Sequence, residues 1–319
     1  MYVFLDVPSV VTPTLNGLLD RVYGAENVFL GSRYRSLCEV AEAFDELPSP
    51  RKGEISVISQ PFGVGLNRVL GSDNRYLLLF SDPAERVLAI HRAAKSGRRH
   101  MSLRKFVESG SVPEVDNGLV RLVSGSQTRP FGCIGTEDLE AAKANLRDRF
   151  ATFGFADDFN ASLVLFGEKL GWKHVPLYRV KSMEATRSAG RISARDRAIV
   201  EAHCRLDIEL YRYARELYDE EIARLGQDFA RELRTYEGAL GDVERIIGRE
   251  HADWKRKNSV IAKVTRKPAR LLGHVRKALG LRTRLMALRR IFARTVEAPE
   301  AMPSPGALNG RIPVQVPNK

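Results

Sequence analysis

Hydrophobic and polar positions alternate along the first 170 residues in a way that predicts strands and helices in turn. Short apolar runs predict strands at Tyr2–Asp6, Asn27–Leu30, Glu54–Ser59 and Arg75–Phe80. Apolar residues three and four apart predict helices at Pro13–Tyr23, Leu37–Leu47, from Pro83 onward, Ser102–Glu108, Glu137–Arg149 and Phe159–Leu170. This alternation predicts an α/β fold with a central parallel sheet flanked by helices, whose sites lie at the carboxyl ends of the strands.

The second half of the chain has a different pattern. From Ser193 to Arg249 apolar residues recur at helical spacing, with dense Arg and Glu on the other face, which predicts a helical C-terminal half. The last residues, 297–319, are rich in Pro and Gly without periodicity and are expected to be disordered. We therefore expect a main domain over 1–250, a helical extension over 251–296 and a tail over 297–319.

Composition narrows the class of protein. The chain has 319 residues, of which 44% are hydrophobic, enough for a sizeable core. Its three cysteines, Cys38, Cys133 and Cys204, are far apart and form no CxxC pair, so we expect neither a disulfide framework nor a metal site. No run reaches the length of a membrane span and the N-terminus lacks signal-peptide order, which predicts a cytoplasmic protein.

The positive charge is concentrated in one segment. The net charge is +12, but Lys255–Arg294 contains 14 Lys and Arg and no acid, which leaves −2 (12 minus 14) for the rest. A generally basic surface for nucleic acid is not expected. Residues 268–294 place leucines on one stripe with arginines beside it, a basic amphipathic helix that would lie on an anionic membrane surface such as the inner face. The alternative is that this helix docks on the body of the protein.

The first loop has the frame of a phosphate site without its usual residues. A strand, a tight loop and a helix bring backbone N–H groups together at FLDVPSVVTPTLNGLL. A phosphate cradle needs glycine for close approach and lysine for charge, and Ser9-Val10-Val11-Thr12-Pro13 contains neither.

Several phrases in order resemble the carbohydrate O-sulfotransferases, which take sulfate from 3′-phosphoadenosine 5′-phosphosulfate (PAPS). They are VFLDVPSVVTPTLNGLL, PFG at Pro61–Gly63, RYLLLFSDPAERVLAIHR, SLRKFVESG, DNGLVRLVSG, LEAAKANLRDRFATFGFADDFNASL and LDIELYRYARELY, and they span Tyr2 to Tyr218. The resemblance implies a P-loop-like sulfotransferase fold, PAPS held across two strand-loop-helix turns, and transfer of the sulfuryl group to a hydroxyl of a carbohydrate acceptor.

The family's donor residues are largely replaced. In the first loop the family lysine position is Ser9 and a glycine position is Thr12, and only Thr14 keeps a matching hydroxyl. In the second turn the arginine and serine that hold the 3′-phosphate are Ser81 and Ala89. Charged hydrogen bonds contribute ~1.5–3 kcal/mol each, so losing two weakens donor binding by ~100-fold or more. If the donor is still bound, the candidate residues are Ser9, Thr12, Thr14, Ser81 and Arg86.

Catalysis and the acceptor side are also altered. The family's general-base histidine before Pro-Phe-Gly is absent, because Ser59 and Gln60 stand there and neither takes a proton at neutral pH. The resemblance places Asn117 and Arg121 near the acceptor, although Asp-Asn-Gly is also an ordinary turn.

Each candidate also has a structural interpretation. Thr12 fits a helix N-cap with Pro13 at the first helical position, and Glu85 with Arg86 fits an ion pair beside the Asp82 cap. His91 and His100 fit ordinary surface positions. The sequence thus predicts either a divergent or catalytically impaired sulfotransferase, or a non-catalytic scaffold that binds a glycan or a protein.

Overall fold

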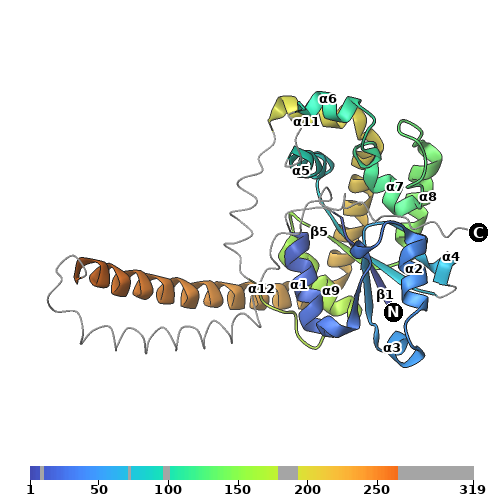
Figure 1. The fold of residues 1–319 in the computed structure, drawn as a ribbon. Coiled ribbons are helices and arrows are strands. Elements are labelled where there is room, and N and C mark those ends of the chain that lie inside the picture. Colours follow the sequence, from blue (N-terminus) through green and yellow to red (C-terminus); the bar gives the residue numbers. More distant parts are fainter. Residues whose placement is uncertain (8–10, 71–72, 96–100, 179–192, 265–319) are drawn as a thin grey trace, which may run out of the picture.

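Five strands form one parallel sheet in the computed structural model of the chain, with the order β2-β3-β1-β4-β5 (Figure 1). The strands are β1 (Tyr2–Leu5), β2 (Val28–Leu30), β3 (Val57–Gln60), β4 (Arg75–Phe80) and β5 (Phe150–Phe155). The structure describes all residues except 8–10, 71–72, 96–100, 179–192 and 265–319. The predicted α/β class with a central parallel sheet is confirmed.

Helices connect the strands, and the described C-terminal part of the chain after β5 is mostly helical. They are α1 (Thr12–Tyr23), α2 (Leu37–Asp45), α3 (Ser49–Glu54), α4 (Leu66–Leu70), α5 (Pro83–Lys95), α6 (Leu103–Glu108), α7 (Gly118–Ser124), α8 (Thr136–Asp148), α9 (Phe159–Leu170), α11 (Ala194–His203) and α12 (Arg205–Val264). Short 3₁₀ turns lie at Ala25–Asn27, Gly31–Arg33 and Pro113–Val115. None of the helices in the described part of the chain is both long and apolar enough to cross a membrane.

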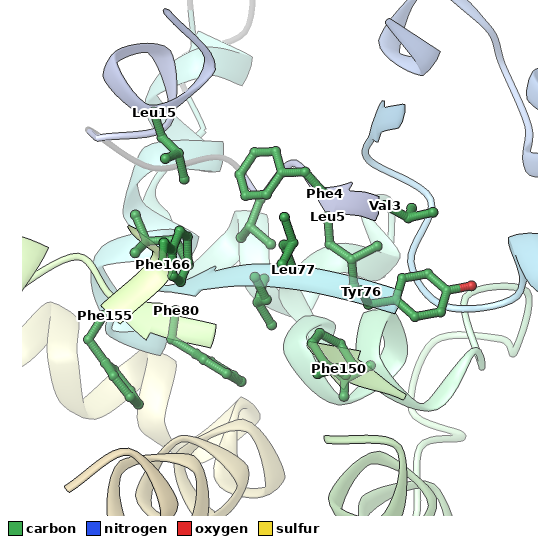
Figure 2. Packing of buried hydrophobic residues seen from close by; sticks show 14 of the residues in the cluster. Val3, Phe4, Leu5, Leu15, Tyr76, Leu77, Phe80, Phe150, Phe155 and Phe166 are labelled. Atoms are coloured by element: carbon green, nitrogen blue, oxygen red, sulfur yellow. The ribbon is translucent and has the colours of Figure 1, made fainter. Parts of the chain in front are cut away.

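The main core is formed by the sheet and the helices on its two faces. Figure 2 shows Leu15 of α1 above the sheet, while Phe80 and Phe155 point to the opposite side, toward α12. Phe80 and Phe155 stack with ring centroids 5.4 Å apart, and Tyr211 of α12 meets Phe155 edge to face at 5.0 Å. Side chains of the inner strands are buried on both faces, because a parallel sheet is covered by its own crossover helices.

A smaller cluster lies beyond the carboxyl ends of the strands. Apolar residues of α5, α6 and α11 pack together there around Val87, Phe106 and Val200. His91 belongs to this layer: it is 3% exposed, and its Nε2 lies 2.9 Å from the carbonyl oxygen of Met101. The expectation that His91 occupies the surface was wrong, because one face of α5 is covered by α6. His100 lies outside the described residues.

Helix α12 has two segments. Gly226 interrupts it with φ 66° and ψ −139°, a conformation that favours glycine, and the chain changes direction there. Figure 1 shows the second segment running past α1 and α9 and out beyond the body of the protein. Past Gly226 the helix runs through residue 250 to Val264. The expected basic helix over 268–294 and the tail over 297–319 lie outside the described residues.

Candidate ligand site at the carboxyl edge of the sheet

The connections of the sheet diverge between β1 and β4. After β1 the chain crosses to β2 and returns through β3 on one side, whereas β4 and β5 lie on the other side. Leu5 pairs with Leu78, so the loop after β1 and the loop after β4 are neighbours at the carboxyl edge. In open parallel sheets ligands bind at such a switch point, outside the carboxyl ends of the strands.

The described residues on either side of the loop after β1 contact one another or the core. The Thr12 hydroxyl donates to the carbonyl of Val7 at 2.6 Å, and Val11 is fully buried in the main core. Helix α1 begins at Thr12 with Val11 in the N-cap position, so the expectation that Thr12 is the cap was wrong by one residue. Its hydroxyl bridges the loop instead. Thr14 lies half-buried in the first turn of α1, and Ser9 lies outside the described residues.

An acid and an amide lie beside this loop. Asp6 follows β1 directly, and Asn16 Nδ2 of α1 donates to its carboxylate at 3.2 Å. Burial raises the pKa of Asp6, and the hydrogen bond from Asn16 offsets only part of this. The Asn16 Oδ1 atom is buried, and no described residue is its hydrogen-bond partner. The described side chains here thus offer acceptors, the opposite of what a phosphate needs.

Ser81 lies on the same face of the sheet as Asp6. Since Leu5 pairs with Leu78, Asp6 stands opposite Leu79, and Ser81 is two residues further on. Ser81 is 4% exposed, and its hydroxyl oxygen has no hydrogen-bond partner among the residues that the structure describes. Unpartnered buried polar atoms are uncommon in folded proteins and call for a water or a ligand.

At the second turn, after β4, Asp82 caps the following helix as the sequence predicted. Its carboxylate accepts from the backbone N–H groups of Ala84 and Glu85, both at 3.0 Å, and so caps α5. Arg197 of α11 adds an ion pair, with Nη1 3.1 Å from Asp82 Oδ2. No sequence pattern pointed to Arg197, because 115 residues separate it from Asp82.

Arg86 does not face this turn. It is 1% exposed, and its Nη1 donates to the carbonyl of Glu114 at 2.7 Å. Its guanidinium also lies against Gly118, where an added Cβ would approach Nη1 to 2.5 Å. The Nε atom has no hydrogen-bond partner within the described ranges. Arg86 therefore places its charge inside the junction of α5 and α7, away from the loop after β1.

Gln60 is one of the two residues that stand where the family has its general-base histidine, and its side chain holds the Pro-Phe-Gly loop in place. Its Nε2 donates to the carbonyl of Gly63 at 2.9 Å, and its Oε1 accepts from the N–H of Phe62 at 2.5 Å. The preceding residue, Ser59, is 2% exposed, and its hydroxyl has no hydrogen-bond partner in the described part of the chain. Neither residue supplies a proton acceptor of the required strength at neutral pH.

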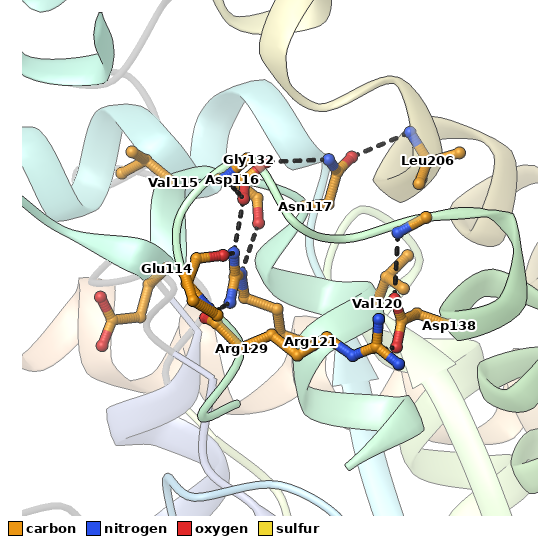
Figure 3. Close-up of polar contacts among 12 residues, drawn as sticks. Glu114, Val115, Asp116, Asn117, Val120, Arg121, Arg129, Gly132, Asp138 and Leu206 are labelled. Atoms are coloured by element: carbon orange, nitrogen blue, oxygen red, sulfur yellow. Dashed lines mark hydrogen bonds and ion pairs between the residues drawn. The ribbon is translucent and has the colours of Figure 1, made fainter. Parts of the chain in front are cut away.

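Asn117 and Arg121 belong to a buried polar network (Figure 3). Arg121 is 3% exposed, and its Nε donates to the carbonyl of Asp116 at 2.8 Å while Nη2 reaches the carboxylate of the same residue at 2.5 Å. Two further carbonyls, of Arg129 and Pro130, accept from the same guanidinium at 2.6 and 2.9 Å. Asn117 precedes α7 with φ 49° and accepts from the N-terminus of α12. The structure therefore gives both residues interior partners.

Comparison with known proteins adds no assignment: no protein-family model matches the sequence, and a search of curated proteins finds no match. Within the described ranges no group of three or more His, Cys, Asp and Glu side chains could hold a metal ion.

Proposed function

We propose that this chain is a divergent carbohydrate sulfotransferase of the PAPS-dependent type. In this proposal the P-loop-like fold keeps the two strand-loop-helix turns of the donor site, and the usual phosphate-binding residues on them are replaced. One observation carries the proposal. The resemblance assigns the donor to the loops after β1 and β4, and these strands are neighbours at the point where the sheet connections diverge. The co-substrate would be PAPS and the acceptor a hydroxyl of a polysaccharide or oligosaccharide.

The replacement cation in this proposal is Arg197. This chain has Ser81 where the family has an arginine, so it lacks a positive charge at that position. Arg197 brings a guanidinium to the adjacent Asp82 from another helix. The contacts of Arg197 with the carboxylates of Asp82 and Glu201 are made by Nη1, at 3.1 and 3.6 Å. The fork of N–H groups on a guanidinium suits a phosphate oxygen, and the Ser81 hydroxyl, which has no partner among the described residues, would add a second donor.

A second function is favoured by the interior roles of the other candidates. Arg86, Arg121 and Gln60 each hold part of the fold together, and the groups at Asp6 and Asn16 are acceptors. This arrangement suits a non-catalytic scaffold that binds a glycan, because sugar hydroxyls donate to carboxylate and amide oxygens. In that case the enzyme chemistry has been lost and the carboxyl-edge site binds an uncharged ligand.

Titration calorimetry with 3′-phosphoadenosine 5′-phosphate, the stable product of the donor, separates the two functions. Micromolar binding would support the donor site, and transfer of labelled sulfate from PAPS to a mixture of polysaccharides would then test catalysis. Binding weaker than millimolar would overturn the sulfotransferase proposal. A neutral oligosaccharide mixture is the companion probe, because binding of it without the nucleotide is the result expected for the scaffold.

A further inference from the structure

One apolar seam runs along the second segment of α12. Its residues are Phe229, Leu233, Tyr236, Leu240, Val243 and Ile247, spaced alternately by four and three. The same spacing continues along the sequence through Trp254, Ile261 and Val264, with Glu250 and Lys257 at the two intervening positions. A repeat of 3.5 residues sustained over this length is the sequence pattern of a coiled coil.

The body of the protein covers only the first part of the seam. Phe229, Tyr236 and Leu240 are 5%, 6% and 3% exposed and belong to the main core. The Tyr236 hydroxyl donates to the carbonyl of Pro176 at 2.9 Å, and Asn160 of α9 donates to Glu237 at 3.2 Å. These contacts dock the helix against α9 and the segment that follows it.

Beyond Leu240 the apolar spacing of the seam continues along the same helix. We call residues 241–264 the arm. Figure 1 shows the arm extending away from the body. Val243 and Ile247 are only partly buried and belong to none of the hydrophobic clusters of the described residues, and Ile246 beside them is 53% exposed. An isolated helix of this length is marginal in water, so its apolar stripe needs a partner.

We propose that the arm pairs with the arm of a second copy of this chain in an antiparallel coiled coil. Charge favours this occupant and this direction. Residues 241–253 contain four acids and two arginines, a net charge of −2, whereas residues 254–264 contain four basic residues and no acid, a net charge of +4. Antiparallel pairing sets the acidic half of each arm opposite the basic half of the other. Parallel pairing sets +4 against +4.

The polar seam positions lead to the same orientation. In a parallel pair Glu250 faces Glu250 and Lys257 faces Lys257, which places like charges together in the seam. In the sequence, the seam of the arm runs from Val243 to Val264, and its full antiparallel overlap sets Val243 in the same layer as the partner subunit's Ile261. In that register Glu250 and the partner subunit's Lys257 fall in adjacent layers, where opposite charges attract.

Sedimentation equilibrium of the full chain tests the pairing. The expected result is a species of twice 35.7 kDa at micromolar concentration. The double variant Val243→Asn with Ile247→Asn should raise the dissociation constant at least tenfold. Arg249→Asn is the matched control, because it introduces the same residue at an exposed position off the seam, and it should behave as the parent.

Two results of this experiment would overturn the proposal. One is a chain that remains monomeric at a concentration of about 100 micromolar. The other is a dimer whose dissociation constant the double variant does not raise. Flotation of a monomer with vesicles of phosphatidylcholine and phosphatidylserine that the double variant abolishes would identify an anionic membrane as the occupant of the arm instead.

Disulfide trapping tests the direction in a background where the exposed Cys38 and Cys133 are replaced by serine. Mixing a Val243→Cys chain with an Ile261→Cys chain should give a cross-linked heterodimer, and neither chain should link to itself. Self-linked Val243→Cys dimers without the mixed product would show a parallel pair and overturn the antiparallel assignment.

Discussion

Asn117 and Asp207 each cap the helix that carries the other. The side-chain oxygen of Asn117, just before α7, accepts from the backbone N–H groups of Leu206 and Asp207 at 2.9 and 3.3 Å in the first turn of α12. The Asp207 carboxylate accepts from Leu119 and Val120 at 3.0 and 2.8 Å in the first turn of α7. Two helix starts about 90 residues apart in sequence are thereby satisfied by one pair of side chains.

Replacing Asp207 should destabilise the fold strongly. Asp207→Ala leaves two buried N–H groups at the start of α7 without acceptors, so we expect the free energy of unfolding to fall by about 2–4 kcal/mol. Asn117→Gly should cost less than Asn117→Ala, because both lose the acceptor but glycine tolerates the φ of 49°. Urea denaturation measures the free energy of unfolding of all three variants.

A double variant that changes both Asn117 and Asp207 should lose less stability than the sum of the two single losses, since the caps join the same helices. Full additivity would contradict the reciprocal coupling.

The buried ion pair of Asp116 and Arg121 gives a second prediction. Arg121→Ala removes the cation from the buried Asp116 carboxylate, which keeps only the neutral donors of Asn117 and Gly132, and takes the guanidinium away from the three carbonyls that accept from it. We expect a loss of about 3–5 kcal/mol. Arg121→Lys should recover little, because one ammonium cannot reach partners arranged around a planar fork. The exposed pair of Arg231 and Asp228 is the matched control: Arg231 is 73% exposed, and Arg231→Ala should change stability by about 0.5 kcal/mol or less.

The sequence did not predict these buried caps and ion pairs, although it predicted much of the fold. The strand at Arg75–Phe80 and the helix at Phe159–Leu170 have the predicted bounds, because one is a continuous apolar run and the other a strongly periodic one. Strand β5 was not predicted: it includes Gly154 and lies directly between α8 and α9 without a turn signal. The strand predicted at Glu54–Ser59 starts only at Val57, because residues 49–54 form α3 after Pro48.

The site residues show why local pattern is insufficient. Asp-Asn-Gly was interpreted as a turn or an acceptor contact, yet α7 begins there because a carboxylate from α12 satisfies its first N–H groups. Arg86 follows an acid and a helix cap, which suggested an ion pair at the turn. Its actual partner, the Glu114 carbonyl, is 28 residues away. Long-range partners of this kind leave no spacing that a single sequence reveals.

The buried acid beside the first loop predicts a pH dependence of stability. Burial raises the folded pKa of Asp6 above its ordinary 3.8, so the folded state holds the proton more tightly than the unfolded chain. Stability therefore falls as pH rises from 3.8 through the folded pKa, and the cost is fully present above it. Asp6→Asn removes this titration, and its amide can donate to the unpartnered Asn16 Oδ1.

We expect Asp6→Asn to match the parent near pH 3.5 and to be the more stable protein at pH 7. Thermal unfolding followed across this range measures the difference. The exposed Asp73→Asn is the control, because it lies in solvent and should show no such trend. An Asp6→Asn variant that is less stable than the parent at pH 7 would mean that the ionised carboxylate is favoured in the fold, contrary to the burial argument.

Arg197 offers the sharpest test of the proposed donor site, because its structural and binding roles predict different results. Its ion pair with Asp82 is 38% exposed on the arginine side, so Arg197→Ala should change the free energy of unfolding by about 1 kcal/mol or less. If its guanidinium contacts a donor phosphate, the same variant should weaken binding of 3′-phosphoadenosine 5′-phosphate by about tenfold or more, the effect of one charge-assisted hydrogen bond. Arg195→Ala removes an equal charge from an exposed position on the same helix and should leave both quantities unchanged. Equal weakening by the two variants would show a general effect of charge, and unchanged affinity in Arg197→Ala would exclude this arginine as the replacement cation.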